Sequence, residues 1–396
     1  MTKINTKIFV TLFFAMFATV TGVGIVVPLL PVYAQSLGAS GVLIGLIFGG
    51  FSLTRSIFLP LFGRLSDHHG RKPFLVAGLF FYFLISLLFI LAYHVYVLIA
   101  IRLVQGIASA MIMPVAQAYV GEITPKGKEG VTMGIFNMSI FTGLSIGPLL
   151  GGVIQDHFGL SAAFGSMAGM AFIAFSLSLV MLPPAASEKI AAFGRAPVRW
   201  GLILSDRVIV SLVMFRFLYT ACIGVIWGFL PVYGAVRFDL SSSAIGFLVM
   251  LGVSVSGLMH VPMGMLSDRW SKINMVMAGG VVVAVSMIMM GEAGGFYGLF
   301  AASLVFGVGG GISMPAVMGL AVVRGNRIQA MGTVMALITM GHSMGMMIGS
   351  VLAGAIMDMV GLEVAFFSGG VLMAAGVVYF YFGTRRAGTN YKAPGP

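Results

Sequence analysis

Charge is scarce in this chain of 396 residues, because aspartate, glutamate, lysine and arginine together make up only 8% of it. Acids are the scarcer sign, with 11 acidic against 22 basic residues. The single cysteine, Cys222, excludes a disulfide framework within the chain. Because 59% of the residues are hydrophobic, the chain carries more apolar surface than a water-soluble fold of this length could bury. We therefore expect a protein whose main solvent is lipid.

The sequence motifs of common enzymes are missing as well. There is no G-x-S-x-G, no phosphate-binding glycine loop and no spaced cluster of metal ligands. We therefore expect no enzymatic activity, no cofactor and no metal site.

Long apolar runs fill most of the chain. Each is near or above the ~20 residues that a helix needs to cross a bilayer, and backbone groups in lipid are satisfied by helices. The first run is too long for a signal peptide and no small-residue cleavage site follows it, so we expect a retained helix. The sequence predicts an all-α integral membrane protein with twelve transmembrane helices, at residues 8–33, 41–62, 74–92, 95–121, 131–155, 161–182, 208–235, 241–265, 274–291, 296–322, 329–357 and 362–383.

The loops between these runs differ sharply in charge. All lysines and arginines outside the spans fall on the side that holds both termini, except Arg237. The positive-inside rule then places both termini in the cytoplasm, in a multi-pass protein of the cell (inner) membrane. The net charge of +11 is explained by this basic inner face, so we expect the bilayer as a partner and no nucleic acid.

An internal repeat divides the spans into two sets of six. "GRLSDHHGRKP" at Gly63 returns as "GMLSDRWSKIN" at Gly264, 201 residues later, and "LVQGIASAMIMP" at Leu103 returns as "LVFGVGGGISMP" at Leu304. Parallel repeats of this kind are expected where two bundles move against each other around a central site. We predict a first six-helix bundle at 1–182, a cytoplasmic linker at 183–207, and a second bundle with a short tail at 208–396.

Three stretches of the sequence resemble motifs of the major facilitator superfamily, more narrowly of its twelve-helix drug and proton antiporter branch. They are "GRLSDHHGRKP", "IRLVQGIASA" and "GLSIGPLLGG", in order and each on its expected helix or loop. The resemblance covers nearly the whole chain. It implies two six-helix bundles and alternating access. Gating is assigned to the motif residues Gly63, Asp67, Gly70, Arg71, Lys72, Gly143, Gly147, Pro148, Gly151 and Gly152, and to Asp268 in the second copy of the first motif.

The first motif can also be examined through its chemistry. Gly63 and Gly70 would permit a tight turn, and the Asp67 carboxylate could make charge-assisted hydrogen bonds that hold one conformation and release in another. We expect Asp67 and Arg71 to form this latch. The alternative is that Arg71 and its basic neighbours only fix the topology.

Glycines in the fifth span recur every four residues, at 143, 147 and 151, beside Pro148. This spacing places them on one helix face and lets another backbone approach closely. The eleventh span repeats the spacing at 341, 345 and 349. Either this face slides or seals during gating, or it serves helix packing alone.

Three arginines fall inside predicted spans, where charge is expensive and is expected to face a cavity or a partner. They are Arg55, Arg102 and Arg216, and no acid lies at a comparable depth. We expect them, with Tyr219 and Trp227, to line a substrate site that favours anions or polar acceptors. A structural role is the alternative, most of all for Arg102, which has Gln105 three residues away.

Proton coupling requires a titratable group in the cavity, and histidine changes charge near neutral pH. His260 and His342 lie within predicted spans, and Asp67, Glu122 and Asp156 at span ends are further candidates. Each histidine could instead be a hydrogen-bonded structural residue. The first span has no acid of the kind that exporters of cations commonly carry, which makes cationic substrates less favoured.

Three functions fit this sequence. The first is a monomeric secondary transporter that exports a small amphipathic or anionic organic molecule in exchange for protons. The second is a lipid or lysolipid transporter on the same fold, and the third is a membrane receptor that transports nothing.

Overall fold

The computed structural model describes residues 3–125, 128–183, 205–328 and 330–385. Twelve of its helices are long and apolar enough to cross a membrane. This confirms the predicted all-α fold with twelve spans. Most of the predicted linker, at 184–204, and the tail, at 386–396, lie outside the described residues, so the division into bundles at 183–207 stays a prediction.

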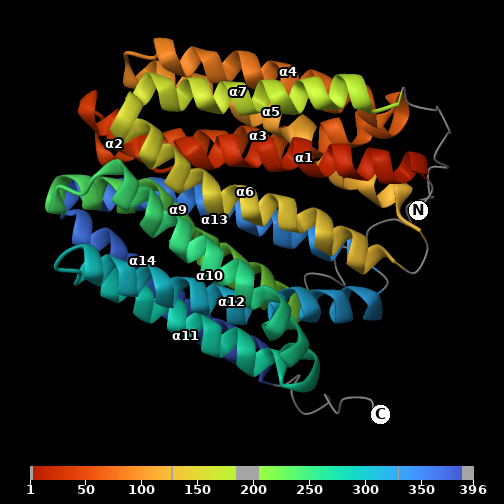
Figure 1. The fold of residues 1–396 in the computed structure, drawn as a ribbon. Coiled ribbons are helices and arrows are strands. Elements are labelled where there is room, and N and C mark those ends of the chain that lie inside the picture. The colour runs from red at the N-terminus through yellow and green to blue at the C-terminus, as the bar shows by residue number, and fades with distance from the viewer. Residues whose placement is uncertain (1–2, 126–127, 184–204, 329, 386–396) are drawn as a thin grey trace. The chain divides into compact units, whose positions relative to one another are not determined.

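Within each continuous stretch of described residues, the helices follow one another with short connections (Figure 1). The first span consists of two helices, because Pro28 lies between them and has no backbone N–H to continue the ladder. The helices of the described residues are α1 (Lys3–Val26), α2 (Leu29–Ser36), α3 (Gly41–His69), α4 (Arg71–Leu88), the 3-10 turn η1 (Phe89–Leu91), α5 (Val95–Ile123), α6 (Glu129–Phe158), α7 (Leu160–Met181), α9 (Arg207–Phe238), α10 (Ser242–Arg269), α11 (Lys272–Gly291), α12 (Phe296–Arg327), α13 (Met331–Met359) and α14 (Leu362–Thr384).

The turn after the second span differs from our expectation. Gly63 lies inside α3, which continues to His69, and the chain turns at Gly70 alone, where φ is +90°. Glycine is tolerated inside a helix at a modest cost in stability, whereas a turn residue with positive φ favours glycine strongly. The prediction that Gly63 forms part of the turn was therefore wrong. As a consequence, Arg55 stands at the midpoint of α3, fourteen residues from either end.

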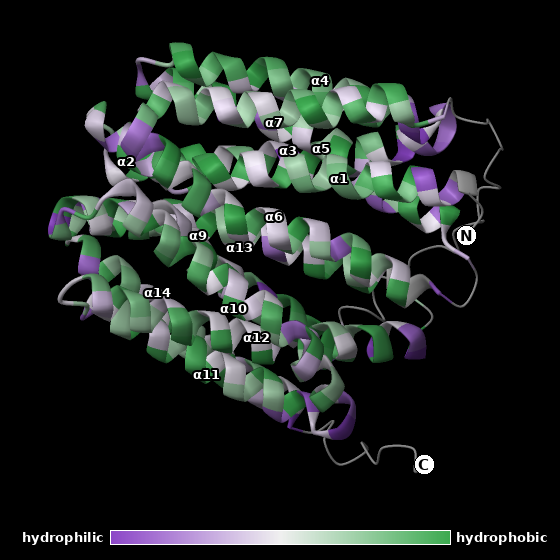
Figure 2. Cartoon of the chain, viewed as in Figure 1, coloured by the Kyte–Doolittle hydropathy of each residue, from purple (hydrophilic) through white to green (hydrophobic). Residues whose placement is uncertain are grey.

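The chain forms two compact units. The first comprises Met1–Ala192 and Leu230–Met250, and the second comprises Phe193–Phe229 and Leu251–Pro396. In the first unit α1 packs against α6 and α7, while α5 packs against α3 and α4. In the second unit α11 packs against α12 and α14, and α13 packs against α12 and α14. Hydrophilic residues gather near helix ends, and the middle portions are mainly apolar (Figure 2).

The glycine face of α6 lies directly on α1. An added Cβ at Gly147 would meet the backbone of Thr21 and Gly24, and one at Gly151 would meet the backbone of Ile25. The equivalent glycines of α13 meet the backbone of α9 in the same way, Gly345 at Phe217 for example. The close helix approach that we expected from the four-residue spacing is therefore present. Whether this face moves in gating stays a prediction.

Gly151→Ala is expected to destabilise the protein by about 1–3 kcal/mol, because its methyl group would overpack the interface with α1. Thermal unfolding in detergent, followed by tryptophan fluorescence, measures the effect. The matched control is Gly165→Ala on α7, where an added Cβ meets nothing within 4 Å and alanine is the better helix former. Equal melting temperatures for the two variants would contradict the packing described above.

Candidate substrate and coupling sites

Arg55 of α3 is held by a thioether. Its Nη2 lies 3.2 Å from the Sδ of Met113 on α5, and its buried Nε has no hydrogen-bond partner. The side chain remains partly exposed. Sulfur of this kind is only a weak acceptor, so the guanidinium of Arg55 keeps donor capacity for an additional acceptor.

Arg216 of α9 stands in a similar setting in the second unit. Its Nη1 donates to the Sδ of Met314 on α12, and its Nη2 donates to the Nδ1 of His342 on α13 at 3.1 Å. The buried Nε again has no partner. Sequence reasoning placed Arg216 and His342 in separate groups of candidates, and the structure brings them into contact.

The two methionines occupy equivalent places in the repeat. Met113 and Met314 are 201 positions apart, and each immediately precedes a proline inside its helix. Their role was missed, because methionine alone usually signals packing in an apolar interior. The repeated Met-Pro pair at this spacing was the signal that could have pointed to them.

Arg102 of α5 is bonded within its own unit. Its Nε donates to the carbonyl of Ile47 at 3.1 Å, and its Nη1 donates to Gln105 Oε1 at 2.8 Å. The guanidinium also lies 4.3 Å from the ring centroid of Phe51. It borders a small cavity of about 10 Å³, also lined by Tyr82, whose buried hydroxyl has no hydrogen-bond partner among the described residues. Such a space is large enough for about one water molecule.

The other two candidates for substrate contact share the Arg216 face of α9. Tyr219 lies one turn beyond Arg216, with the guanidinium 5.9 Å from its ring centroid, and its ring stacks on Phe306 at 5.8 Å. Trp227 lies eleven residues from Arg216 on the same helix, which is about 16 Å along the axis. Only Tyr219 therefore contacts the Arg216 cluster.

The histidines have different surroundings. Arginine can only donate, so the His342 Nδ1 that meets Arg216 is an acceptor and its proton is on Nε2. His260 of α10 has its Nδ1 2.5 Å from the carbonyl of Ser256 in its own helix, and it interacts electrostatically with Arg216. Protonation of His342 at Nδ1 would break its bond to Arg216. Protonation of His260 would not break its contact with Ser256 in this way, because the partner of its Nδ1 is a carbonyl, which accepts.

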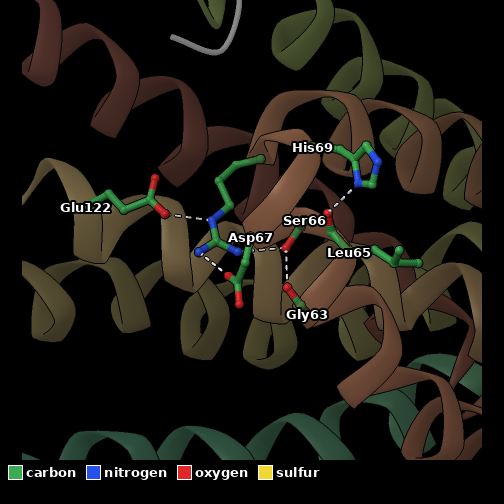
Figure 3. Close-up of polar contacts among 7 residues, drawn as sticks. Gly63, Leu65, Ser66, Asp67, His69 and Glu122 are labelled. Carbon is green, nitrogen blue, oxygen red and sulfur yellow. Dashed lines mark hydrogen bonds and ion pairs between the residues drawn. The ribbon is translucent and has the colours of Figure 1, made fainter. Parts of the chain in front are cut away.

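Arg71 connects the ends of three helices in the first unit. Its partners Asp67, Ser66 and Glu122 are labelled in Figure 3. From the start of α4 it reaches Asp67 Oδ1 of α3 at 2.5 Å and Glu122 Oε1 of α5 at 2.7 Å, and its Nη1 donates to Ser66 Oγ at 2.7 Å. The Arg71 side chain is 11% exposed, against 42% for Asp67 and 32% for Glu122. The expected pairing of Asp67 with Arg71 is present, and Glu122 completes the cluster.

The second repeat has a reduced form of this cluster. Lys272 contacts Asp268 at 3.3 Å and the carbonyl of Ser267 at 2.5 Å, both on α10. Glu122 has Val323 as its counterpart 201 positions later. Lys72, which neighbours Arg71, instead donates to the carbonyl of Leu182 at 2.5 Å, tying the start of α4 to the end of α7.

Asp156 caps a helix. Its carboxylate accepts the backbone N–H groups of Ser242 and Ser243 at 3.0 and 2.8 Å, so the end of α6 is joined to the start of α10. An acid at a helix N-terminus is stabilising. This arrangement lies within the first unit, and it differs from the free titratable site that a proton carrier needs.

A further ion pair was missed from the sequence. Asp206 caps the start of α9 and lies 3.6 Å from Arg324 at the end of α12. The positions 201 residues earlier are linked as well, since Asn5 donates to the carbonyl of Ile123 at 3.3 Å. The same two helix ends are therefore joined in each repeat by different chemistry.

Twelve spans, a parallel repeat and partly exposed arginines within the spans define the class of multi-pass membrane transporters. The family model of the Major Facilitator Superfamily matches residues 12–327 and, in a second alignment, residues 217–396. The chain belongs to the major facilitator superfamily, whose members are transport proteins rather than enzymes.

Relatives cover almost the full length of the chain. An MFS-type transporter of Methanocaldococcus jannaschii is 31% identical over 366 residues, which are 91% of this chain and 94% of the relative. The quinolone resistance protein NorA of Staphylococcus aureus is 24% identical over 378 residues, covering 94% of this chain and 95% of NorA. The similarity supports a drug-efflux-like transporter.

Solved structures show the same fold. The nucleoside transporter NupG matches with a TM-score of 0.78 at 14% identity, over 95% of this chain and 99% of that one. The human organic anion transporter MFSD10 matches with a TM-score of 0.65 at 16% identity, over the same shares of the two chains. At these identities the likeness concerns the fold alone.

Proposed function

We propose that the protein exports a small amphipathic or anionic organic molecule in exchange for protons, by alternating access. The observation that carries this proposal is the state of two arginines inside the spans. Arg55 and Arg216 each contact a methionine sulfur. Within the described residues, the Nε of each has no hydrogen-bond partner and no acid is bonded to either guanidinium. A guanidinium within a membrane span whose hydrogen-bond donors are incompletely satisfied favours a ligand with an anionic or polar acceptor.

Arg102 has a structural role in this account, because a carbonyl, an amide and an aromatic ring already satisfy it. Substrate contacts are assigned to Arg55 in the first unit, and to Arg216 with Tyr219 in the second. The relative that is named for quinolone resistance supports an organic substrate that carries an acceptor group.

Proton exchange is assigned to His342. Neutral His342 orients Arg216 through Nδ1, whereas a proton on Nδ1 removes the acceptor and places a second positive charge beside the guanidinium. A substrate that binds Arg216 in the position fixed by His342 therefore binds the protein when His342 is neutral. Tyr219 and His260 are the titratable neighbours of this pair among the contacts described above. Competition between substrate and proton at one site gives exchange.

The basic loops support the proposal that both termini of this multi-pass protein lie in the cytoplasm. The membrane that we propose for the chain is the inner membrane of the cell. We propose that a monomer transports substrate on its own, because each of the two compact units of one chain carries its own arginine cluster.

Flux in proteoliposomes tests the proposal. A quinolone carboxylate loaded on one side should move faster when the opposite side is more acidic, and its methyl ester, which lacks the anionic group, should move much more slowly. Equal flux of acid and ester would contradict the anion preference. Flux that ignores the pH gradient would contradict proton exchange, and movement of phospholipid alone would favour a lipid transporter.

A further inference from the structure

A groove runs between α1 and α7 in the first unit, apart from the arginine clusters. Its volume is about 650 Å³, and its walls are side chains of α1 from Thr6 to Ala18 and of α7 from Met170 to Met181. The two helices lie side by side (Figure 1). Several lining residues are well exposed, including Phe14 at 52% and Ile173 at 49%. The groove is therefore open to the surroundings of the protein.

The groove is a wedge that closes near the middle of the span. An added Cβ at Gly22 would lie 3.2 Å from the carbonyl of Met167 and 3.3 Å from the Cβ of Met170, so the helices touch there. The residues that line the groove lie on the N-terminal side of Gly22 in α1 and from Met170 to Met181 in α7. Glycine at position 22 thus fixes the closed end, and the open end lies at Lys7 and Met181.

The length of the wedge matches one leaflet. Lys7 and Ala18 are eleven residues apart on α1, which is about 16 Å along a helix. Half of a hydrocarbon core of ~30 Å is about 15 Å. The deep part is lined by Phe14, Phe17 and Ile173, with polar side chains at the mouth. An acyl chain that enters from the membrane surface would fill a groove of this depth and polarity.

The mouth carries a cation without a partner. Lys7 is exposed, and its ammonium group forms no hydrogen bond or ion pair within the described part of the chain. No acidic side chain lines the groove among these residues. Lysine at a membrane surface attracts anionic lipid with about 1 kcal/mol. The charge at the mouth thus complements a negative headgroup.

We propose that this groove binds one anionic phospholipid, with an acyl chain between α1 and α7 and its phosphate at Lys7. With the N-terminus in the cytoplasm, the lipid belongs to the inner leaflet. This site is separate from the transport site, and the proposal does not depend on the substrate or on proton exchange.

Native mass spectrometry of the full chain, with added phosphatidylglycerol or phosphatidylcholine, tests the proposal. Lys7→Gln is expected to reduce bound phosphatidylglycerol about fivefold, the equivalent of ~1 kcal/mol, and to leave phosphatidylcholine unchanged. Ile173→Trp fills the groove and is expected to reduce binding of both lipids.

Two controls match these variants. Lys128→Gln removes another exposed lysine, and Leu179→Trp changes a residue of α7 with 46% exposure that lies outside the groove lining. Both should bind lipid as the wild type does. Wild-type phosphatidylglycerol binding in Lys7→Gln and Ile173→Trp would overturn the proposal, as would equal wild-type affinity for the two lipids.

Discussion

Replacing Arg216 with glutamine is expected to reduce substrate affinity roughly 100-fold while the protein still folds and inserts. The change removes the guanidinium that donates to Met314 and His342 and that has an unpaired Nε for the substrate. Losing one partner of a desolvated charge-assisted contact typically costs 2–5 kcal/mol, so affinity should fall roughly 100-fold. Equilibrium binding of the quinolone carboxylate in detergent measures this loss.

Arg237→Gln is the matched control, because it removes an exposed arginine near the end of the same helix. Its affinity should equal that of the wild type, and the melting temperatures of both variants should show that they are folded. Unchanged affinity in folded Arg216→Gln and in folded Arg55→Gln would remove the basis for an anionic or polar-acceptor substrate.

Replacing Arg71 with glutamine is expected to slow transport about tenfold and to leave substrate affinity intact. Two carboxylates, Asp67 and Glu122, would lose the cation that joins them, and the ends of α3 and α5 would lose their link to α4. Charge-assisted hydrogen bonds contribute about 1.5–3 kcal/mol, and here the partial exposure of both acids reduces this value. A remaining contribution of ~1.4 kcal/mol corresponds to about a factor of ten in a conformational equilibrium.

Flux and binding measured on the same preparation separate these effects. Arg64→Gln, which removes an exposed cation of α3 seven residues earlier in the chain, serves as the control. In a double-mutant cycle Arg71→Gln and Glu122→Gln should be non-additive, since the two side chains are in contact. Additive effects on flux, or lost affinity in Arg71→Gln, would argue against a conformational role.

The spans and the repeat could be predicted from the sequence because lipid imposes long apolar runs and duplication leaves matching motifs. The glycine face of α6 could be predicted too, since a four-residue spacing has one geometric meaning on a helix. The turn between the second and third spans was predicted correctly at Gly70 and wrongly at Gly63. Composition does not tell whether a glycine such as Gly63 ends a helix or continues it.

The partners of the charged residues were harder to predict. That Arg216 meets His342 depends on the packing of α9 against α13, residues 126 positions apart. Methionine as the acceptor for Arg55 and Arg216 follows no common pairing rule, and only the repeat hints at it. Asp156 as a helix cap likewise becomes visible only when the start of α10 is placed beside the end of α6.

The coupling of substrate to proton at the Arg216–His342 pair is the central claim, and proton release on binding tests it most directly. Calorimetric titration of the quinolone carboxylate, repeated in two buffers of different ionisation enthalpy, measures the protons exchanged between about pH 5 and 8, where histidine changes charge. We predict that the wild type releases a proton when substrate binds and that His342→Gln binds substrate without proton exchange. Proton uptake by the wild type, or equal release by both proteins, would contradict the account.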